Sequence, residues 1–353
     1  METPRMPSRR HYLGMLGALP AIGVLGSALD VAAQCPPPPP PPPPPGPGMT
    51  NVQTFGAKGD GVTDDTNALQ NACNSGQVLF FPKTSAFYKT SHFLDLSNSV
   101  YSNGAEIRLR QDGTIDTSIF RVIQNPAALT IDGFILNGLY SGGTAGEYSM
   151  GVLLYSVGNV TISNNTIKNT YGDNIYVGQW VSPVPCRNIT VTNNTLLNPY
   201  RNNVSLIYVD TAMVSNNTIK KTVDYVCGID MEPNPGASYV KNVTISGNNF
   251  DCPRQCMNAC CANSVPNSGL LVHNNTATGI LFCVSQSGLL NLANFTSNNF
   301  LCKAPSNNAR MFVLWHCSAT LTSNIDYTPA GASYHSLSQY NANLNLISNT
   351  FVP

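Results

Sequence analysis

Two acidic residues, Asp230 and Glu232, are separated by one residue in the segment 226–232. On a β-strand, residues two apart project on the same side, with Cα atoms on the order of 6–7 Å apart. Two such carboxylates can flank a glycosidic oxygen, one as proton donor and the other as base or nucleophile. The alternative is a pair of solvated surface acids before the loop at 233–235. Only 10% of the residues are charged, so two acids so close together favour a functional interpretation.

Aligning this segment with the two preceding repeats places further polar residues on the same face. Tyr176 and Ser205 take the position of Asp230, and all three are expected to point outward. Asp173 and Arg201 lie at the near end of this face, one or two repeats away, and are expected to assist the acid pair. Four residues are candidates for substrate binding, two of them aromatic rings that can stack on a sugar: Tyr176, Trp180, Asn202 and Asn203.

A lyase or epimerase would use the same face differently, with a base for a sugar proton and a group that neutralises a uronate. Arg201 with Tyr176 or Tyr200 would serve without a metal. Calcium held by Asp173, Asp230 and Glu232 would serve as well, with oxygen ligands at roughly 2.4 Å. The carboxylate pair favours a hydrolase that needs no cofactor and leaves calcium as the alternative.

An internal repeat positions these residues. A short alternating strand, an Asn-containing turn and a second strand recur, most clearly at 159–167, 188–196, 213–219 and 242–250. The first Asn of each turn falls at positions 164, 193, 216, 248, 274, 298, 324 and 349. One unit is too short to bury a core, whereas units stacked at roughly 4.8 Å bury a continuous one. Asn tolerates left-handed backbone angles, and Asn side chains at equal heights can bond to one another along the stack.

The repeat therefore predicts an all-β fold, a single-stranded right-handed parallel β-helix of about ten coils. A propeller, the alternative, needs blades of roughly 40 residues with four strands each. The observed spacing of the turns is shorter than that.

The N-terminal residues are predicted to lie outside this domain. Residues 1–33 combine three arginines, an apolar stretch and small residues, which is typical of an export signal. Residues 8–13 resemble a twin-arginine signal, and an ordinary secretory signal is the alternative. Residues 34–48 form a linker in which ten consecutive prolines favour a polyproline II spacer on the order of 30 Å long. The β-helix domain is assigned to residues 49–353.

Charge and hydropathy exclude two classes of protein. The chain has 18 basic and 18 acidic residues, so it lacks the basic excess that nucleic-acid binding needs. No apolar run reaches the roughly 18 residues of a transmembrane helix. With so little charge, 41 asparagines supply much of the polar surface.

Ten cysteines lie between Cys73 and Cys317, and an even number in an exported chain favours disulfides. The cluster at positions 252, 256, 260 and 261 lacks the paired spacing of a zinc site. Distances from the turn asparagines predict that Cys256 pairs with Cys283 and Cys227 with Cys260.

Residues 51–73 resemble the opening segment of the pectate lyase superfamily, the branch with rhamnogalacturonase- and epimerase-like domains. The resemblance rests on the turn Gly59-Asp60-Gly61 and on Asp64-Asp65-Thr66, followed by a short helix that would cap the coil stack. It implies the β-helix fold. Asp64 and Asp65 stand at the start of the expected helix, where acids are favoured, so a structural role is expected of them. The resemblance does not specify a reaction, because that branch includes hydrolases, lyases, epimerases and non-catalytic phage proteins. The G-H-G and R-I-K motifs of polygalacturonases, the R-x-P-x-x-R segment of pectate lyases and the D-P-H-E motif of alginate epimerases are absent.

The sequence thus predicts a secreted or cell-surface protein that cleaves glycosidic bonds of an extended, uronate-containing or neutral polysaccharide. A lyase or epimerase and a non-catalytic adhesive β-helix are the alternatives.

Overall fold

The computed structural model describes residues 48–351, apart from the segments 110–116, 125–127, 143–147, 180–183, 222–226, 235–237, 253–254, 260–266, 279, 285–289, 302–310, 329–335 and 341. The predicted export signal and nearly all of the linker lie outside the described residues, and so does Trp180. The boundaries assigned to these regions therefore stay predictions.

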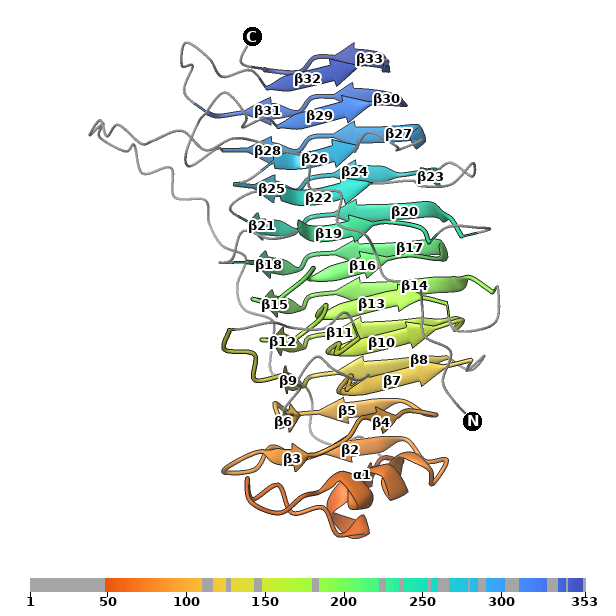
Figure 1. Cartoon of the computed structure of the whole chain (residues 1–353), viewed down its shortest axis with the longest axis vertical. Helices are drawn as coiled ribbons and strands as arrows, with labels where there is room; N and C mark the ends of the chain where they lie inside the picture. Colours follow the sequence, from red (N-terminus) through yellow and green to blue (C-terminus); the bar gives the residue numbers. More distant parts are fainter. Residues whose placement is uncertain are drawn as a thin grey trace, which may run out of the picture. The chain divides into compact units, whose positions relative to one another are not determined.

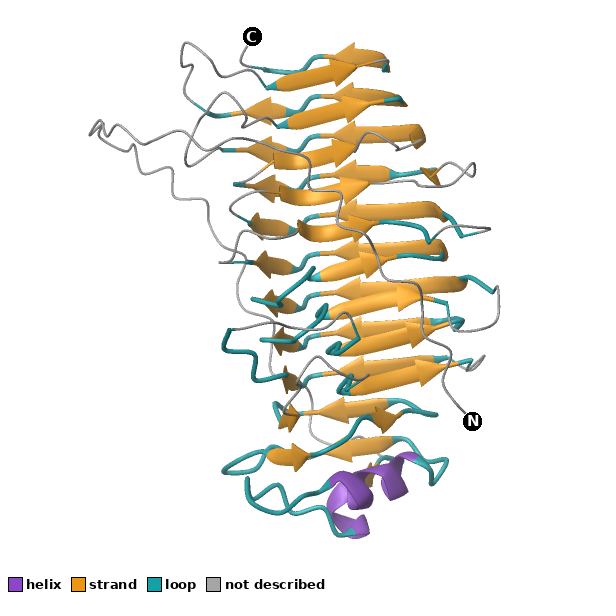
Figure 2. Ribbon diagram, viewed as in Figure 1, coloured by secondary structure: helices purple, strands orange, loops and turns teal. Residues whose placement is uncertain are grey.

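The described residues form three sheets of parallel strands, here called A, B and C, and the chain visits the three sheets in turn as it winds from coil to coil (Figure 1). Sheets B and C have ten strands each and sheet A has thirteen, which confirms the predicted right-handed parallel β-helix of about ten coils. Strands dominate and one α-helix is present among the described residues (Figure 2). None of the described helices is long and apolar enough to cross a membrane.

Sheet A contains β1 (Thr50–Asn51), β2 (Leu79–Phe81), β5 (Val100–Ser102), β8 (Leu129–Asp132), β11 (Val160–Ser163), β14 (Cys186–Thr192), β17 (Val209–Ser215), β20 (Val240–Ser246), β23 (Asn267–Ser268), β24 (Leu271–His273), β27 (Leu290–Thr296), β30 (Cys317–Thr322) and β33 (Asn343–Ile347). Sheet B contains β3 (Tyr88–Thr90), β6 (Glu106–Leu109), β9 (Ile135–Asn137), β12 (Thr166–Lys168), β15 (Thr195–Leu197), β18 (Thr218–Lys220), β21 (Asn249–Asp251), β25 (Thr276–Ala277), β28 (Asn299–Phe300) and β31 (Ile325–Asp326). Sheet C contains β4 (Leu94–Asp95), β7 (Phe120–Ile123), β10 (Val152–Tyr155), β13 (Ile175–Gly178), β16 (Val204–Leu206), β19 (Cys227–Met231), β22 (Gln255–Ala259), β26 (Ile280–Val284), β29 (Phe312–Trp315) and β32 (Leu337–Tyr340).

The core lies inside the coils and follows from strand alternation. In β11, Val160 and Ile162 are buried, and the residues between and after them are partly exposed. Each buried Val or Ile side chain contributes about 1.5–3 kcal/mol relative to its exposed state. The stacking repeats these contacts from coil to coil, so no single coil has to form a core of its own.

In the turn between sheets A and B, one residue adopts the left-handed backbone conformation and the next residue supplies the side chain of the Asn ladder. Asn164, Asn193 and Asn216 have positive φ angles of 55–56°, so the first Asn of each pair makes the left-handed turn. The next residue forms a buried ladder through its amide, and its members are Asn165, Asn194, Asn217, Asn248, Asn275, Asn298, Asn324 and Asn349. The predicted ladder is confirmed, and it uses the residue that follows the left-handed position. That residue is the second Asn where an Asn makes the turn, and the first Asn where Gly247 or Ser297 makes it.

The N-terminal end of the coil stack is covered by the helix α1 (Thr66–Cys73), next to the 3-10 helix η1 (Val52–Phe55) (Figure 1). Leu69 and Ala72 are fully buried, as expected for residues that cover a sheet edge. Asp65 occupies the N-cap position, but its carboxylate accepts hydrogen bonds from the backbone N–H groups of Lys58 and Gly59 at 2.7 and 2.9 Å. These bonds close the Gly59 turn on the helix, which confirms the structural role expected of Asp65.

The cysteines of the described residues do not follow the predicted disulfide pattern. Cys227 and Cys256 are free and buried, as are Cys73, Cys186, Cys252 and Cys317. Cys283 lies beside Asn258 in the register of β22 and β26, two positions from Cys256, so the Cys256–Cys283 pairing is wrong. Counting residues from the turn missed the register because the loops between strands differ in length. The proposed partner of Cys227, Cys260, lies outside the described residues.

We expect the six free cysteines to resist thiol reagents in the native protein and to react fully after unfolding. Burial raises the pKa of Cys186 to about 11 and that of Cys73 to about 12. Because the thiolate is the reactive form, both burial and the raised pKa slow alkylation. Mass spectrometry after iodoacetamide treatment with and without denaturant measures this. Rapid native labelling of Cys186, or a Cys256–Cys283 cross-link in a non-reducing peptide map, would contradict it.

Candidate active site

The candidate site lies on the outer face of sheet C and at the adjoining corner with sheet B. Strand pairing sets Tyr176 of β13 beside Ser205 of β16, and Ser205 beside Asp230 of β19. The neighbouring positions, such as Ile175, Val204 and Ile229, belong to the core. This register is the one predicted from the sequence, including its two-residue shift.

Asp230 is held by two side-chain amides from neighbouring coils. Asn202 Nδ2 donates to Oδ2 of Asp230 over 3.1 Å, and Asn258 Nδ2 donates to Oδ1 over 3.0 Å. Asn258 occupies the same column as Asp230 in the next coil. The carboxylate therefore has a fixed orientation, as a general acid, base or nucleophile requires.

Asp230 lies on the outward side of its strand, as expected, but its exposed fraction is only 4%. Pointing away from the core is not the same as reaching water on this face, since Tyr176 is also 4% exposed and Ser205 is fully buried. Strand parity predicts direction alone, and exposure depends on the packing around each side chain.

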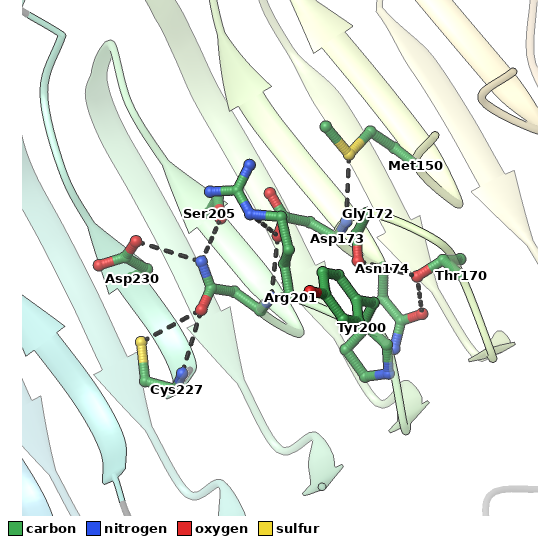
Figure 3. Close-up of polar contacts among 12 residues, drawn as sticks. Met150, Thr170, Gly172, Asp173, Asn174, Tyr200, Arg201, Ser205, Cys227 and Asp230 are labelled. Carbon is green, nitrogen blue, oxygen red and sulfur yellow. Dashed lines mark hydrogen bonds and ion pairs between the residues drawn. The ribbon is translucent and has the colours of Figure 1, made fainter. Parts of the chain in front are cut away.

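Asp173 and Arg201 come together at the corner between sheets B and C, as predicted (Figure 3). Arg201 Nε lies 3.8 Å from Asp173 Oδ1, and the same oxygen accepts the backbone N–H of Asn202 at 2.8 Å. Asp173 is fully buried, and its Oδ2 has no hydrogen-bond partner within the part of the chain that the structure describes. The adjacent guanidinium compensates this buried charge.

Asn202 joins the two acids into one network. Its backbone N–H donates to Asp173, and its side-chain Nδ2 donates to both Asp230 and Ser205 Oγ, the latter at 3.1 Å. Its side-chain oxygen accepts the backbone N–H of Cys227 at 3.1 Å. Asn202 is fully buried, so the structure gives it a structural role between the acids instead of the predicted direct sugar contact.

Asn203 and Tyr176, two other residues predicted to contact a sugar, are also buried. Asn203 is fully buried, and its side-chain oxygen accepts from Asn174 Nδ2 at 2.8 Å, which forms a second, short Asn ladder inside the corner. Tyr176 packs edge-on against Tyr155 with ring centroids 5.8 Å apart. A Cβ at Gly178 would lie 2.5 Å from the Tyr176 ring, so this glycine makes room for the ring over its own strand. Neither Asn203 nor Tyr176 offers a free face to a sugar in this conformation.

Glu232 directly follows β19, and its backbone N–H still donates to Leu206 at 3.2 Å, which keeps it in register with Asp230. Its exposure is intermediate, so it is the more accessible acid of the pair. No group of three or more Asp, Glu, His or Cys side chains among the described residues is arranged to hold a metal ion. Asp173, Asp230 and Glu232 thus do not form the calcium site considered from the sequence.

Sequence reasoning missed Asn258, which belongs to this network, and the buried Lys221, which bonds to backbone oxygens of the adjoining turn. Extending the alignment by one repeat would have placed Asn258 beside Asp230. Nothing in the sequence distinguishes Lys221 from its neighbour Lys220, although Lys221 is 2% exposed and the side chain of Lys220 is 48% exposed.

Comparison with known proteins supports the fold first. Residues 49–86 match the family model described as rhamnogalacturonase A/epimerase, pectate lyase-like. This segment contains the turn and capping helix described above, so the resemblance to the pectate lyase superfamily is confirmed. No curated protein sequence matches the chain.

Solved structures similar to this chain are parallel β-helix proteins of low sequence identity. The N-terminal fragment of gene product 12 of bacteriophage Phi29 has a TM-score of 0.67 and 15% identity, over 84% of this chain and 57% of that one. A tailspike mutant of E. coli bacteriophage HK620, in complex with a pentasaccharide, has a TM-score of 0.62 and 15% identity, over 85% and 62%. The A-module of the Azotobacter vinelandii mannuronan C-5 epimerase AlgE4 has a TM-score of 0.51 and 14% identity, over 85% and 96%. This chain spans about three fifths of the two phage proteins, and at these identities the likeness shows the fold alone.

Proposed function

We propose that this protein is an exported carbohydrate-active enzyme that cleaves glycosidic bonds of an extended polysaccharide. The observation that carries the proposal is the fixed carboxylate of Asp230, held by Asn202 and Asn258, with the more accessible Glu232 two residues further on. Few structural tasks require two acids and an adjacent Asp173–Arg201 pair on one face of so charge-poor a chain.

The two carboxylates are suited to different roles. Asp230 is fixed by two N–H donors, which suits a nucleophile or base that must meet the sugar in one orientation. Glu232 is more accessible and suits the acid that protonates the leaving oxygen. Arg201 and Asp173 support the site from the neighbouring coils. This hydrolytic scheme uses no cofactor.

The structural neighbours agree with a polysaccharide substrate. The tailspike of bacteriophage HK620 was solved with a pentasaccharide, and the AlgE4 module is a mannuronan epimerase. Loops that leave a β-solenoid commonly build its binding surface. A secreted or cell-surface location follows from the predicted export signal and suits such a substrate.

The proposal is tested by incubating the full chain with neutral and uronate-containing polysaccharides and measuring the reducing ends released. We expect release from at least one polysaccharide, without the ultraviolet absorbance of an unsaturated uronate. That absorbance would instead indicate a lyase. Tight binding of a polysaccharide without cleavage would contradict an enzyme and favour an adhesive protein.

A further inference from the structure

Lys221 is a buried cation that the proposed chemistry does not use. It directly follows β18, and its exposed fraction is 2%. Its Nζ donates to the backbone oxygens of Pro199 at 3.0 Å and Tyr200 at 3.2 Å, and also to that of Arg201. An ammonium group has three N–H donors, so each is matched by one carbonyl of the turn in the preceding coil.

The turn that Lys221 binds is the one that places the candidate site. The backbone N–H groups of Tyr200 and Arg201 donate to Thr170 and Gly172 of the coil on the other side, at 2.9 and 3.1 Å. The turn is therefore bonded through its N–H groups to one coil and through its carbonyl groups to Lys221. The residue that ends it, Arg201, pairs with Asp173.

We propose that Lys221 is a positioning residue: by holding the three carbonyls of the turn 199–201, it keeps Arg201 against Asp173 and Asn202 between the two acids. The predicted effect of Lys221 on turnover rests on the proposed function. Its predicted effect on the position of Arg201 does not.

The alternative is that Lys221 only fills the interior of the coil. A hydrophobic side chain would do that at lower cost, because a buried ammonium must give up its hydration. Exact matching of three donors to three adjacent carbonyls indicates selection for the shape of this turn. The charged or titratable groups that influence the ammonium are Cys227, Asp173, Cys252 and Arg201.

Burial lowers the pKa of Lys221 to about 8. In the unfolded chain, the pKa returns to its ordinary value near 10.5. Between these values the unfolded state binds more protons, so the contribution of Lys221 to the free energy of unfolding rises with pH. The same loss of a proton leaves an amine with two N–H donors for three carbonyls. Above about pH 8, the hold of Lys221 on the turn 199–201 should therefore weaken, while its contribution to the free energy of unfolding rises. A side chain that only fills space would not produce this combination.

The test compares Lys221→Met with Lys220→Met in the full chain. Lys220 is the matched control, because its Nζ faces outward and lies 3.5 Å from Asp251. The first readout is the NMR signal of the Arg201 Nε–H, assigned with Arg201→Lys. We expect it to move to the position of an exposed arginine in Lys221→Met and to stay unchanged in Lys220→Met. An unchanged signal in Lys221→Met would overturn the inference.

The second readout is turnover. Misplacement of a site by about 1 Å can cost roughly a hundredfold, so Lys221→Met should lower kcat by about that factor with little change in KM. Combining it with Arg201→Lys should add little further loss, because both changes act on the same contact. If no polysaccharide is cleaved, the proposed function fails, while the Arg201 signal still decides the role of Lys221.

A milder variant covers the case in which Lys221→Met does not fold. Lys221→Gln keeps two N–H donors and removes the charge, so we expect a folded protein with a partial shift of the Arg201 signal. It should also lose the rise in free energy of unfolding between about pH 8 and pH 10 that Lys221 gives the parent protein. A full wild-type signal in folded Lys221→Gln, together with an unchanged pH profile of stability, would show that the ammonium does not position the turn.

Discussion

Glu232→Gln and Asp230→Asn are each expected to lower turnover on the cleaved polysaccharide by a factor of about 100 or more, the usual scale for removal of a positioned acid or base. Both changes preserve size and remove the ability to exchange a proton. Initial rates at saturating substrate measure the effect. Asp251→Asn, which alters a half-exposed acid on sheet B, is the matched control and should leave turnover unchanged.

The two variants should differ in stability, which separates a catalytic loss from a structural one. Asp230 accepts one amide N–H on each oxygen, so an Asn at this position places its own NH2 group against one of those donors. A buried unmatched donor costs about 1–3 kcal/mol, and the melting temperature of Asp230→Asn should fall accordingly. Glu232 is partly exposed, and Glu232→Gln should change the free energy of unfolding by less than about 0.5 kcal/mol.

Full activity of both variants would place the site elsewhere on the coils. A fall in turnover of Asp230→Asn alone, with Glu232→Gln fully active, would reduce the pair to a single acid and remove the basis of the hydrolytic scheme.

The fold and the register of the candidate site followed from the sequence because both depend on periodicity. The alternation of Val160 and Ile162 with polar residues is local, and the Asn turns repeat it at each coil. Because side chains alternate along a strand, the repeat then predicted that Tyr176, Ser205 and Asp230 lie side by side on one face, whatever the conformation of the loops.

What the sequence did not predict depends on loops and packing. The burial of Asp230 and Tyr176 is set by side chains around the outer face, which have no fixed spacing. The error in the Cys256–Cys283 pairing has the same origin, since a register counted through irregular loops drifts by two residues. Lys221 and Lys220 are adjacent and chemically identical, and only the turn of the preceding coil distinguishes them.

The largest stability effect is expected from the Asn ladder, at Asn217→Ala. Asn217 Oδ1 accepts both the backbone N–H of Asn194 at 2.8 Å and its side-chain Nδ2 at 3.0 Å. Asn217 Nδ2 donates to Asn248 Oδ1 at 3.0 Å and to the Val191 carbonyl at 2.9 Å. Alanine removes all four contacts and leaves the N–H of Asn194 buried without its acceptor. We expect the free energy of unfolding to fall by roughly 2–5 kcal/mol, from one orphaned buried donor and the lost hydrogen bonds.

The neighbouring Asn249→Ala is the matched control for this change, because Asn249 is exposed at the start of β21 and lies outside the ladder. Chemical denaturation of the two variants and the parent measures the difference. Each coil contacts only its neighbours, so loss of Asn217 from the ladder should weaken the contacts between its coil and the coils on either side. The coils before and after this position should then unfold in separate transitions. Equal stability of Asn217→Ala and Asn249→Ala would show that the strands hold the stack without the ladder. The left-handed turn stays in place in both variants, because it is made by Asn216 and not by Asn217.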